Sequence, residues 1–429
     1  MLRAFAQAFR TPDLRNKLLF TLAIMALFRL GAFIPAPGVD YGNVQICVNA
    51  SNQSILDMVN LFSGGGLLQL SVFALGIMPY ITASIIMQLM RVAVPRLEAL
   101  HKEGQSGQSK ITQYTRYLTI ALGVLQSVVV VTMANTGQLY PGCALSPLPD
   151  STPWSNLLTV LAMTAGTGLI MWLGENITER GVGNGMSLLI FTSIIASFPA
   201  QMYSIAGGNN GAVNFAIMIV LILAITLAVT FVELSQRRIP VQYAKRMVGR
   251  RLYGGSTTYI PLKINQSGVI PVIFASSIMQ LPVLAAQFAP TADWSLWLQE
   301  HFLINQGPWY MLVYAAMILF FAFFYTSITF NPDDVSDNMK KYGGFIPGIR
   351  AGKPTAEYLR YVMNRITSAG AVYLTIVALI PVVAIQAMGV QNAMQFGGTT
   401  IMIMVGVGLQ TVREIDSQLQ QRHYEGFLQ

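Results

Sequence analysis

The chain has 429 residues, of which 53% are hydrophobic and only 10% are charged. Soluble domains carry about 25% charged residues, so this composition excludes an ordinary soluble protein and favours a membrane protein. The formal net charge of +8 is compatible with nucleic-acid binding, but the positions of the basic residues along the chain point to membrane topology instead.

Apolar runs long enough to cross a membrane recur along the whole chain. A helix needs about 20 such residues to span the hydrocarbon core, and it satisfies its own backbone hydrogen bonds there. We therefore predict an all-α, polytopic membrane protein with ten transmembrane helices. In chain order, the predicted spans are residues 18–34, 72–90, 111–135, 155–173, 186–199, 214–233, 269–288, 309–330, 368–388 and 396–410.

Lys and Arg are distributed unevenly between the connecting loops. The loops after the odd-numbered spans contain none, whereas the loops after the even-numbered spans and the two ends of the chain are basic. This is the positive-inside pattern, which predicts that both termini are cytoplasmic. Arg29 lies within the first span, about a turn from its outer end, where it either snorkels outward or pairs with an acidic residue.

The apolar run over residues 55–90 is longer than one span needs, and "GGG" and "GIMP" interrupt it. Non-helical backbone at membrane depth is tolerated only where protein buries it or a cavity receives it. We expect a short re-entrant segment from the outside, followed by a span that begins near Met78. Ile81 and Ile85 share one face of that span, either toward lipid and core or toward a cavity.

The chain divides evenly into an N-terminal half, residues 1–200, and a C-terminal half, residues 201–429, with five spans each. Because five is odd, the halves must have opposite orientations, which suits an inverted repeat with a functional path between them. Two cytoplasmic loops, residues 235–265 and 331–365, exceed simple connections and are predicted to be functional.

Two cysteines, Cys47 and Cys143, fall in loops that we place outside. An oxidising exterior permits a disulfide between them. No feature of the sequence indicates that they meet, however, and we expect two unpaired cysteines.

Motifs for catalysis, cofactors and metals are not found. The three histidines are scattered, and no Walker A loop, dinucleotide fingerprint or nucleophile elbow occurs. The spans also lack the buried acidic residues that ion-coupled transporters use. We therefore expect neither an enzyme nor a cofactor or metal site, and the residues alone indicate a polytopic channel or transporter. A secondary transporter of a small solute is the alternative, and an intramembrane enzyme is a third hypothesis.

Five long motifs resemble those of the SecY family, the central subunit of the bacterial protein-conducting channel, and the resemblance runs the whole length of the chain. The motifs are "SVFALGIMPYITASIIMQLM" from Ser71, "KEGQSGQSKITQYTRYLT" from Lys102, "LGENITERGVGNGMSLLIF" from Leu173, "YAKRMVGRRLYGGSTTYIPLKINQSGVIPVIFASSI" from Tyr243 and "NPDDVSDNMKKYGGFIPGIRAGKPT" from Asn331.

The resemblance implies two inverted five-helix halves around an hourglass pore, through which unfolded secretory polypeptides cross the membrane and from which membrane segments leave laterally. A ring of apolar side chains would constrict the pore: Ile81, Ile85, Ile190, Ile273 and Ile403. The re-entrant segment, about residues 56–70, would be the plug that closes the outer funnel, including Leu56, Asp57, Leu61, Phe62, Ser63, Gly64, Gly65 and Gly66. The polar contacts of a lateral gate would be Gln88, Gln126 and Ser277.

Partners also follow from the resemblance. The family assembles with the small membrane subunits SecE and SecG, and its large cytoplasmic loops bind the motor ATPase SecA or the ribosome. Arg250 and Arg251 would meet ribosomal RNA, and Arg350 matches a position linked with motor-driven translocation. Unfolded preproteins, signal sequences and membrane lipid are the further expected partners. The expected location is the bacterial cytoplasmic membrane.

Overall fold

The computed structural model describes residues 9, 11–50, 63–137, 139–140, 143, 145–149, 152–206, 211–243, 246–248, 251–253, 257–288, 292–298, 307–388 and 398–425. Its helices are α2 (Pro12–Phe33), α3 (Tyr41–Ala50), α5 (Met78–Ala93), α6 (Pro95–Lys102), α7 (Gln105–Asn135), α8 (Pro153–Arg180), α9 (Gly185–Ala206), α10 (Gly211–Leu234), α11 (Ile270–Phe288), α12 (Asp293–Leu298), α13 (Pro308–Thr329), α14 (Pro332–Lys341), α15 (Lys353–Met388) and α16 (Gly398–Glu425). The strands are β1 (Gln236–Tyr243), β2 (Arg246–Val248), β3 (Arg251–Tyr253), β4 (Thr257–Lys263) and β5 (Gly344–Phe345).

Each of the ten predicted spans overlaps one of the longer helices, so the predicted polytopic helical fold is confirmed. Among the described residues, six helical stretches are long and apolar enough to cross a membrane, and they contain α2, α7, α8, α10, α13 and α15. Shorter apolar stretches lie in α9 and α11. Helix α5 has only 16 residues because the chain before Met78 is not helical.

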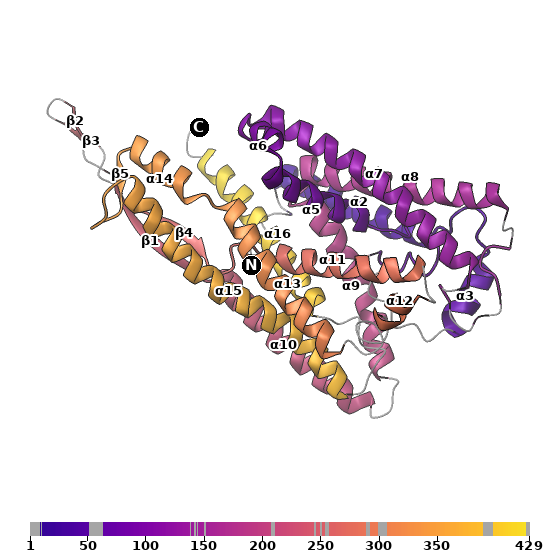
Figure 1. Ribbon diagram of the computed structural model, residues 1–429. Coiled ribbons are helices and arrows are strands. Elements are labelled where there is room, and N and C mark those ends of the chain that lie inside the picture. The colour runs from indigo at the N-terminus through magenta and orange to yellow at the C-terminus, as the bar shows by residue number, and fades with distance from the viewer. Residues whose placement is uncertain are drawn as a thin grey trace.

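The helices form two groups, as Figure 1 shows. Helices α5, α7 and α8 pack in sequence on one side, and α11, α13 and α15 pack in sequence toward the other. Helix α11 also contacts α5 and α7, and α16 contacts α9, α10 and α15. The two groups therefore meet along α9, α11 and α16, where a central site has to be sought.

One end of the molecule carries strands that the sequence analysis did not assign. Within the predicted loop 235–265, β1 and β4 pair antiparallel, with Ile239 opposite Ile260, and β5 pairs with the other edge of β1. Ile239 and Val241 alternate with exposed residues and are buried with Leu359 in a separate apolar cluster. This period of two is the signature of a half-buried strand. We term this end, at the left of Figure 1, the sheet end.

The opposite end carries a disulfide between Cys47 of α3 and Cys143, whose Cα atoms lie 5.3 Å apart. The prediction of two unpaired cysteines is therefore wrong. Their meeting depends on packing that the sequence does not reveal: Cys47 is fully buried in an apolar cluster with Val44 of its own helix and Tyr140 from the loop that contains Cys143. We term this end, where α3 lies in Figure 1, the disulfide end.

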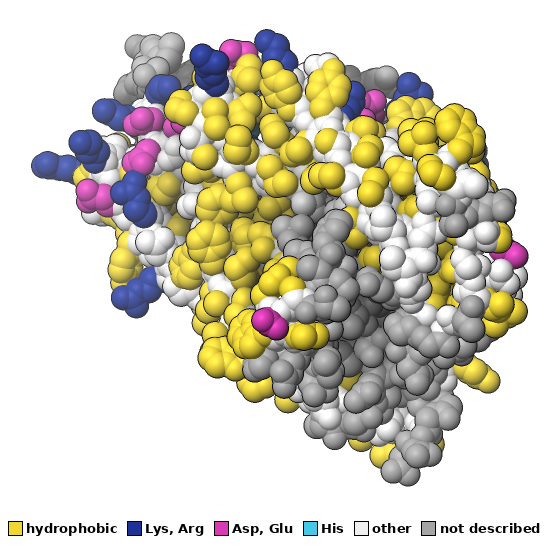
Figure 2. All heavy atoms as spheres, turned by 45° about the vertical axis from the view of Figure 1, so that its right-hand side comes forward, with side chains coloured by type: hydrophobic (Ala, Val, Ile, Leu, Met, Phe, Trp, Pro, Cys, Tyr) yellow, Lys and Arg dark blue, Asp and Glu magenta, His cyan; other side chains and the backbone are white. Residues whose placement is uncertain are grey.

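The surface between the two ends is apolar. Figure 2 shows hydrophobic side chains across the middle of one face, with Lys and Arg gathered along its upper and left margins. On α10, Leu223, Leu227 and Phe231 are all more than half exposed. Side chains of this kind on a polytopic helical protein face lipid, so the chain is a multi-pass membrane protein.

Candidate functional site

Non-helical backbone over residues 63–77 leads into α5. Three glycines there have positive φ angles: Gly64 (67°), Gly65 (93°) and Gly76 (55°). Glycine adopts this conformation without steric cost, whereas the buried Leu70 also has a positive φ of 46° and is held there by its surroundings. Helix α5 begins at Met78 with Pro79 in its first turn, so the predicted break and the predicted start are confirmed.

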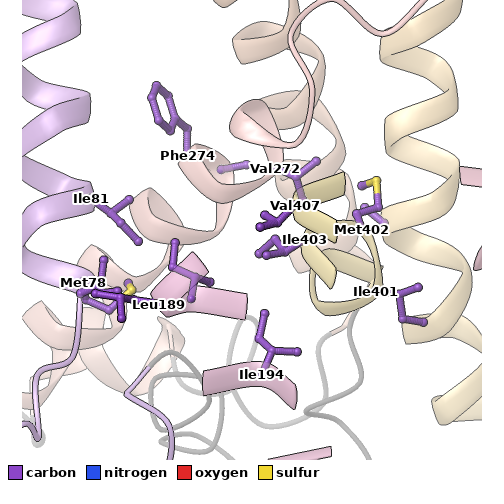
Figure 3. Close-up of a cluster of buried hydrophobic side chains, with 14 of the residues drawn as sticks. Met78, Ile81, Leu189, Ile194, Val272, Phe274, Ile401, Met402, Ile403 and Val407 are labelled. Atoms are coloured by element: carbon purple, nitrogen blue, oxygen red, sulfur yellow. The ribbon is translucent and has the colours of Figure 1, made fainter. Parts of the chain in front are cut away.

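The five residues of the predicted ring come together at the centre of the molecule. Ile81 and Ile85 of α5, Ile190 of α9 and Ile403 of α16 are buried in one apolar cluster, and Ile273 of α11 packs against it. In Figure 3 the side chains of Ile81 and Ile403 point toward one another from opposite sides of this cluster. Four separate helices thus contribute to one continuous apolar cluster, whose central part we term the constriction, and its role as the ring of a pore stays a prediction.

A cavity of about 470 Å³ lies on the sheet-end side of the constriction. Ile81, Ile190 and Ile273 form part of its wall. Its polar wall includes Arg116 of α7 and Glu175 of α8, whose charged atoms lie 2.8 Å apart. The constriction therefore has an apolar surface at the base of a vestibule that contains charged groups.

A second cavity, of about 500 Å³, shares Ile273 with the first. Glu233 at the end of α10 is fixed in its wall: a carboxylate oxygen accepts a 2.6 Å hydrogen bond from Asn265, and its backbone carbonyl accepts one from Arg413 of α16. These bonds tie the base of the β1–β4 hairpin to α10 and α16. The second cavity thus lies at the base of the β1–β4 hairpin, where Lys263 of β4 also lines it.

On the other side of the constriction, Arg29 contacts the predicted plug. Its Nη1 donates a 2.5 Å hydrogen bond to the backbone carbonyl of Gly64, and its guanidinium lies 5.2 Å from the centre of the Phe33 ring. Within the described part of the chain, no acidic side chain forms an ion pair with it. Among the described residues, the hydrogen-bond partner of Arg29 is thus a backbone oxygen, and its pairing with an acidic residue stays a prediction.

We term residues 63–66 the latch segment. The predicted plug residues Ser63, Gly64, Gly65 and Gly66 lie in it, whereas Leu56, Asp57, Leu61 and Phe62 lie outside the described residues. A Cβ atom at Gly64 would lie 2.9 Å from Arg29 Nη1 and 3.3 Å from Ser193 Oγ. Gly64 therefore lies closely between α2 and α9. A Cβ atom at Gly65 would meet nothing within 4 Å.

We term residues 67–75 the clamp segment, which follows directly. The Tyr140 hydroxyl donates a 2.6 Å hydrogen bond to the Leu68 carbonyl, and the Ala36 N–H donates one of 2.9 Å to the Leu70 carbonyl. Leu67, Leu68 and Leu70 are buried in the same apolar cluster as Cys47. The clamp segment is thus part of the folded structure that the disulfide closes.

Helices α2 and α8 pack directly on the clamp segment. A Cβ atom at Gly31 of α2 would lie 2.0 Å from the Phe73 ring, and one at Gly166 of α8 would lie 2.0 Å from the Val72 carbonyl oxygen. Only glycine permits approaches of this kind. The clamp segment is therefore wedged between α2 and α8 by backbone-close packing.

The three predicted lateral-gate residues lie on three helices. Ser277 of α11 is buried and donates to the carbonyl of Ile273 in its own helix. Gln88 of α5 donates to Ser84 Oγ at 3.4 Å, also within its helix. Gln126 of α7 is half-buried. The contacts of Gln88 and Ser277 thus lie within single helices, and their role at a gate stays a prediction.

The predicted partner-binding arginines lie toward the sheet end. Arg350 is exposed, close after β5. Arg251 is the first residue of β3, in the small β2–β3 hairpin. Arg250 lies outside the described residues. Arg350 is therefore available to a partner, and the roles of all three stay predictions.

Sequence reasoning missed several residues of this site. Leu189 and Val407 belong to the same apolar cluster as the predicted ring, and Figure 3 shows them beside Ile81 and Ile403. Their only signal is membership in helical apolar faces, which most spans share. Tyr140 gave no signal, because its partner is a distant backbone carbonyl.

The arrangement has the chemistry of a barrier. Among the described residues, no group of His, Cys, Asp and Glu could hold a metal ion. An apolar constriction offers an ion no replacement for its hydration shell and can exclude water. Aliphatic side chains on separate helices can still move apart around a larger flexible chain.

Comparison with known proteins gives a consistent result. The model of the family described as SecY matches residues 71–412. The chain is 58% identical to the protein translocase subunit SecY of Streptomyces scabiei, over the full length of both chains. It is 53% identical to the protein translocase subunit SecY of Mycobacterium bovis, again over the full length of both.

A solved structure of a protein-conducting channel has the same fold, with a TM-score of 0.60 and 18% identity, covering 93% of this chain and 91% of that one. Another similar structure, covering 94% of this chain and 89% of that one at a TM-score of 0.61 and 18% identity, is that of the idle yeast Ssh1 complex bound to the yeast ribosome.

Proposed function

The chain belongs to the SecY family and is a protein-conducting channel, and on that basis we propose how its residues perform this function. The path for an unfolded secretory polypeptide runs between the N-terminal half, residues 1–200, and the C-terminal half, residues 201–429. The single observation that carries the proposal is the meeting of Ile81, Ile85, Ile190 and Ile403 from three helices, with Ile273 packed against them.

In the resting channel, this ring is the ion barrier. Water and ions enter the vestibule beside Arg116 and Glu175 and stop at the isoleucines, where no polar group replaces the hydration shell. A passing polypeptide separates the isoleucines, which close around it because their side chains are flexible and make no specific bonds. The barrier therefore needs no recognition of the substrate sequence.

Two further movements complete the proposed mechanism. The predicted plug, about residues 56–70, closes the outer side of the ring at rest and leaves it when a chain passes. Membrane segments exit laterally where α5 and α7 face α11 and α13, with Gln88, Gln126 and Ser277 as the polar contacts. Polar contacts between membrane helices contribute only about 1 kcal/mol each, which suits an interface that opens.

Orientation and partners follow from the charge pattern and the family. We propose that the sheet end and both termini face the cytoplasm of a bacterium and that the disulfide end faces outward, since the loops at the disulfide end lack Lys and Arg. SecE, SecG, the motor SecA and the ribosome are the proposed partners. Arg250 and Arg251 meet ribosomal RNA phosphate, where cationic contacts dominate the affinity, and Arg350 serves the motor.

Reconstitution tests the channel function. Vesicles containing the channel, its small partner subunits and the motor receive an unfolded secretory precursor and ATP. We expect ATP-dependent protection of the precursor from added protease. A small-solute transporter, the alternative function, would leave the precursor fully accessible, and that result would refute the proposal.

The ring is tested separately by ion conductance. Replacing Ile81, Ile85 or Ile190 with Asn places an amide in the constriction, so we expect the resting conductance to rise about tenfold, a change of about 1.4 kcal/mol in the closed-to-open equilibrium. Ile195→Asn is the matched control, because Ile195 lies on the same helix as Ile190 but is 43% exposed. Equal conductance for Ile190→Asn and Ile195→Asn would show that Ile190 does not line the pore.

A further inference from the structure

Arg29 is the basic residue that the sequence places within the first span, and the function described above gives it no role. A guanidinium is always charged and is costly within a membrane protein, so its position calls for a specific partner. That partner is the Gly64 carbonyl, at 2.5 Å. A hydrogen bond from a charged donor is about twice as strong as one between neutral groups.

The bond lies next to the proposed ring. Gly64 is in close contact with Ser193 of α9, and Ser193 follows Ile190 by three residues, so both lie on the same face of the helix. One helical turn rises about 5.4 Å. Arg29 therefore holds the latch segment about one turn beyond the constriction, on the side of the disulfide end.

The clamp segment, which follows the latch segment in the chain, is attached by different contacts. The clamp segment is held by Tyr140, by the backbone of Ala36 and by burial, none of which involves Arg29. Gly64 and Gly65 both have positive φ, and Gly65 has open space at its Cβ position. Two bonds also join the latch segment to the clamp segment: Ser63 Oγ accepts from the Leu67 N–H, and the Gly66 carbonyl accepts from the Ser71 N–H. Movement of Gly64 away from α2 thus requires release of the Arg29 bond, whereas the attachments of the clamp segment to Tyr140 and Ala36 can stay in place.

We propose that Arg29 is a positioning residue of the closed channel: its guanidinium holds the Gly64 carbonyl and thereby keeps the latch segment against the outer side of the apolar ring. This inference rests on the proposed function. Opening breaks the bond, and the guanidinium is then satisfied by water or by carbonyl groups of the passing polypeptide.

The test uses the purified channel with its small partner subunits in a planar bilayer. Arg29→Met removes charge and donor while retaining an unbranched apolar side chain, and we expect about a tenfold rise in resting ion conductance. Arg29→Lys keeps the charge and an N–H donor, so we expect a conductance within about threefold of the original protein. Thermal unfolding of each variant is measured alongside.

An effect on the closed state alone supports the inference: raised conductance in Arg29→Met, rescue in Arg29→Lys, and little change in unfolding temperature. Unchanged conductance in Arg29→Met overturns it. So does an equal rise in both variants with an equal fall in unfolding temperature, because Arg29 would then only stabilise the fold. If Arg29→Met cannot be produced as folded protein, Arg29→Gln, which keeps a neutral donor, takes its place. Its resting conductance and unfolding temperature are then compared with those of Arg29→Lys in the same way.

A double-mutant cycle locates the effect. Ala at Gly64 disturbs the Arg29 contact and imposes backbone strain, whereas Ala at Gly65 imposes strain alone. If the two residues act together, the conductance of the double variant Arg29→Met, Gly64→Ala should differ from the product of the two single effects. The double variant Arg29→Met, Gly65→Ala should equal the product of its single effects. Independent effects in both pairs would overturn the inference.

Failure of this inference is distinguishable from failure of the proposed function. If the original protein does not protect a precursor in the presence of ATP, the channel mechanism fails. If it does protect the precursor but the Arg29 variants neither leak nor depend on Gly64, only the role of Arg29 fails.

Discussion

The latch segment and the clamp segment are adjacent in the chain but are held by opposite means. The latch segment has a charge-assisted bond from Arg29 and a glycine with open space beside it. Both segments are buried over most of their length, but the clamp segment also receives hydrogen bonds from distant parts of the chain and belongs to a cluster closed by a disulfide. One bond can be exchanged for another at little cost, whereas a packed core cannot be dismantled piecemeal.

This difference indicates that the latch segment can move while the clamp segment stays in place. A segment can move without disturbing its neighbours only where the adjoining chain is held in place. The clamp segment is held in this way and lies directly before α5. Without that fixed side, movement of the latch segment would pull on α5 and would displace Ile81 and Ile85. Three variants of the clamp segment and its surroundings test the comparison, in order of decreasing expected effect.

Loss of the disulfide should have the largest effect. The bond closes a loop with a sequence separation of 96 residues, and the chain-entropy model assigns about 4–5 kcal/mol of stability to a loop of that length. Replacing both Cys47 and Cys143 with Ser should therefore lower the free energy of unfolding by up to this amount, measured by denaturant or thermal unfolding. Reducing the original protein should give the same result, and an unchanged stability on reduction would contradict the role of the disulfide.

The variant Gly166→Ala should show the next largest loss of stability. Its Cβ would lie 2.0 Å from the Val72 carbonyl oxygen, which is backbone and cannot turn aside. We expect a loss of about 1–3 kcal/mol from overpacking, measured by thermal unfolding. Gly168→Ala is the matched control on the same helix, because its Cβ meets only a methyl group of Ile120 at 3.5 Å. Equal stabilities for the two variants would contradict the close packing of Gly166 against the Val72 carbonyl.

Removal of the Tyr140 hydroxyl should have the smallest effect. Tyr140→Phe loses one buried hydrogen bond, so we expect a loss of about 1 kcal/mol in the free energy of unfolding. Tyr342→Phe is the control, since Tyr342 is 78% exposed. A loss of equal size in both variants would show that the bond to Leu68 contributes nothing.

The same tyrosine predicts a pH dependence. Burial raises the pKa of the Tyr140 phenol above its ordinary value of about 10. Above that pH the unfolded chain loses the proton while the folded protein keeps it, so stability falls as the pH rises. Unfolding curves from pH 8 to 11 should show this fall, and Tyr140→Phe should reduce it.

Features that depend on local pattern were predictable from the sequence. The helix positions follow from apolar runs, and the start of α5 follows from Pro79. The meeting of Ile81 with Ile403 was reached through the family resemblance, since no local pattern indicates which helix faces which. The β1–β4 hairpin was missed because Ile239 and Val241 give only a short alternation among basic residues.

Contacts between distant segments could not be predicted. Cys47 and Cys143 carry no local sign of their pairing, and the distance between them depends on how α3 packs. Arg29 was noticed as an unusual charge, but its partner is a backbone carbonyl, which any residue could provide. Residues that bond to backbone leave no complementary residue to search for.

The disulfide also constrains how the protein is made. Cys47 precedes α5 and Cys143 follows α7, so the bond encloses both helices in a covalent loop. A chain synthesised from its N-terminus cannot close this loop until the third predicted span is complete. The pairing thus implies an order of events during synthesis: α5 and α7 are both synthesised before the disulfide can form, and an oxidised intermediate would mark that stage.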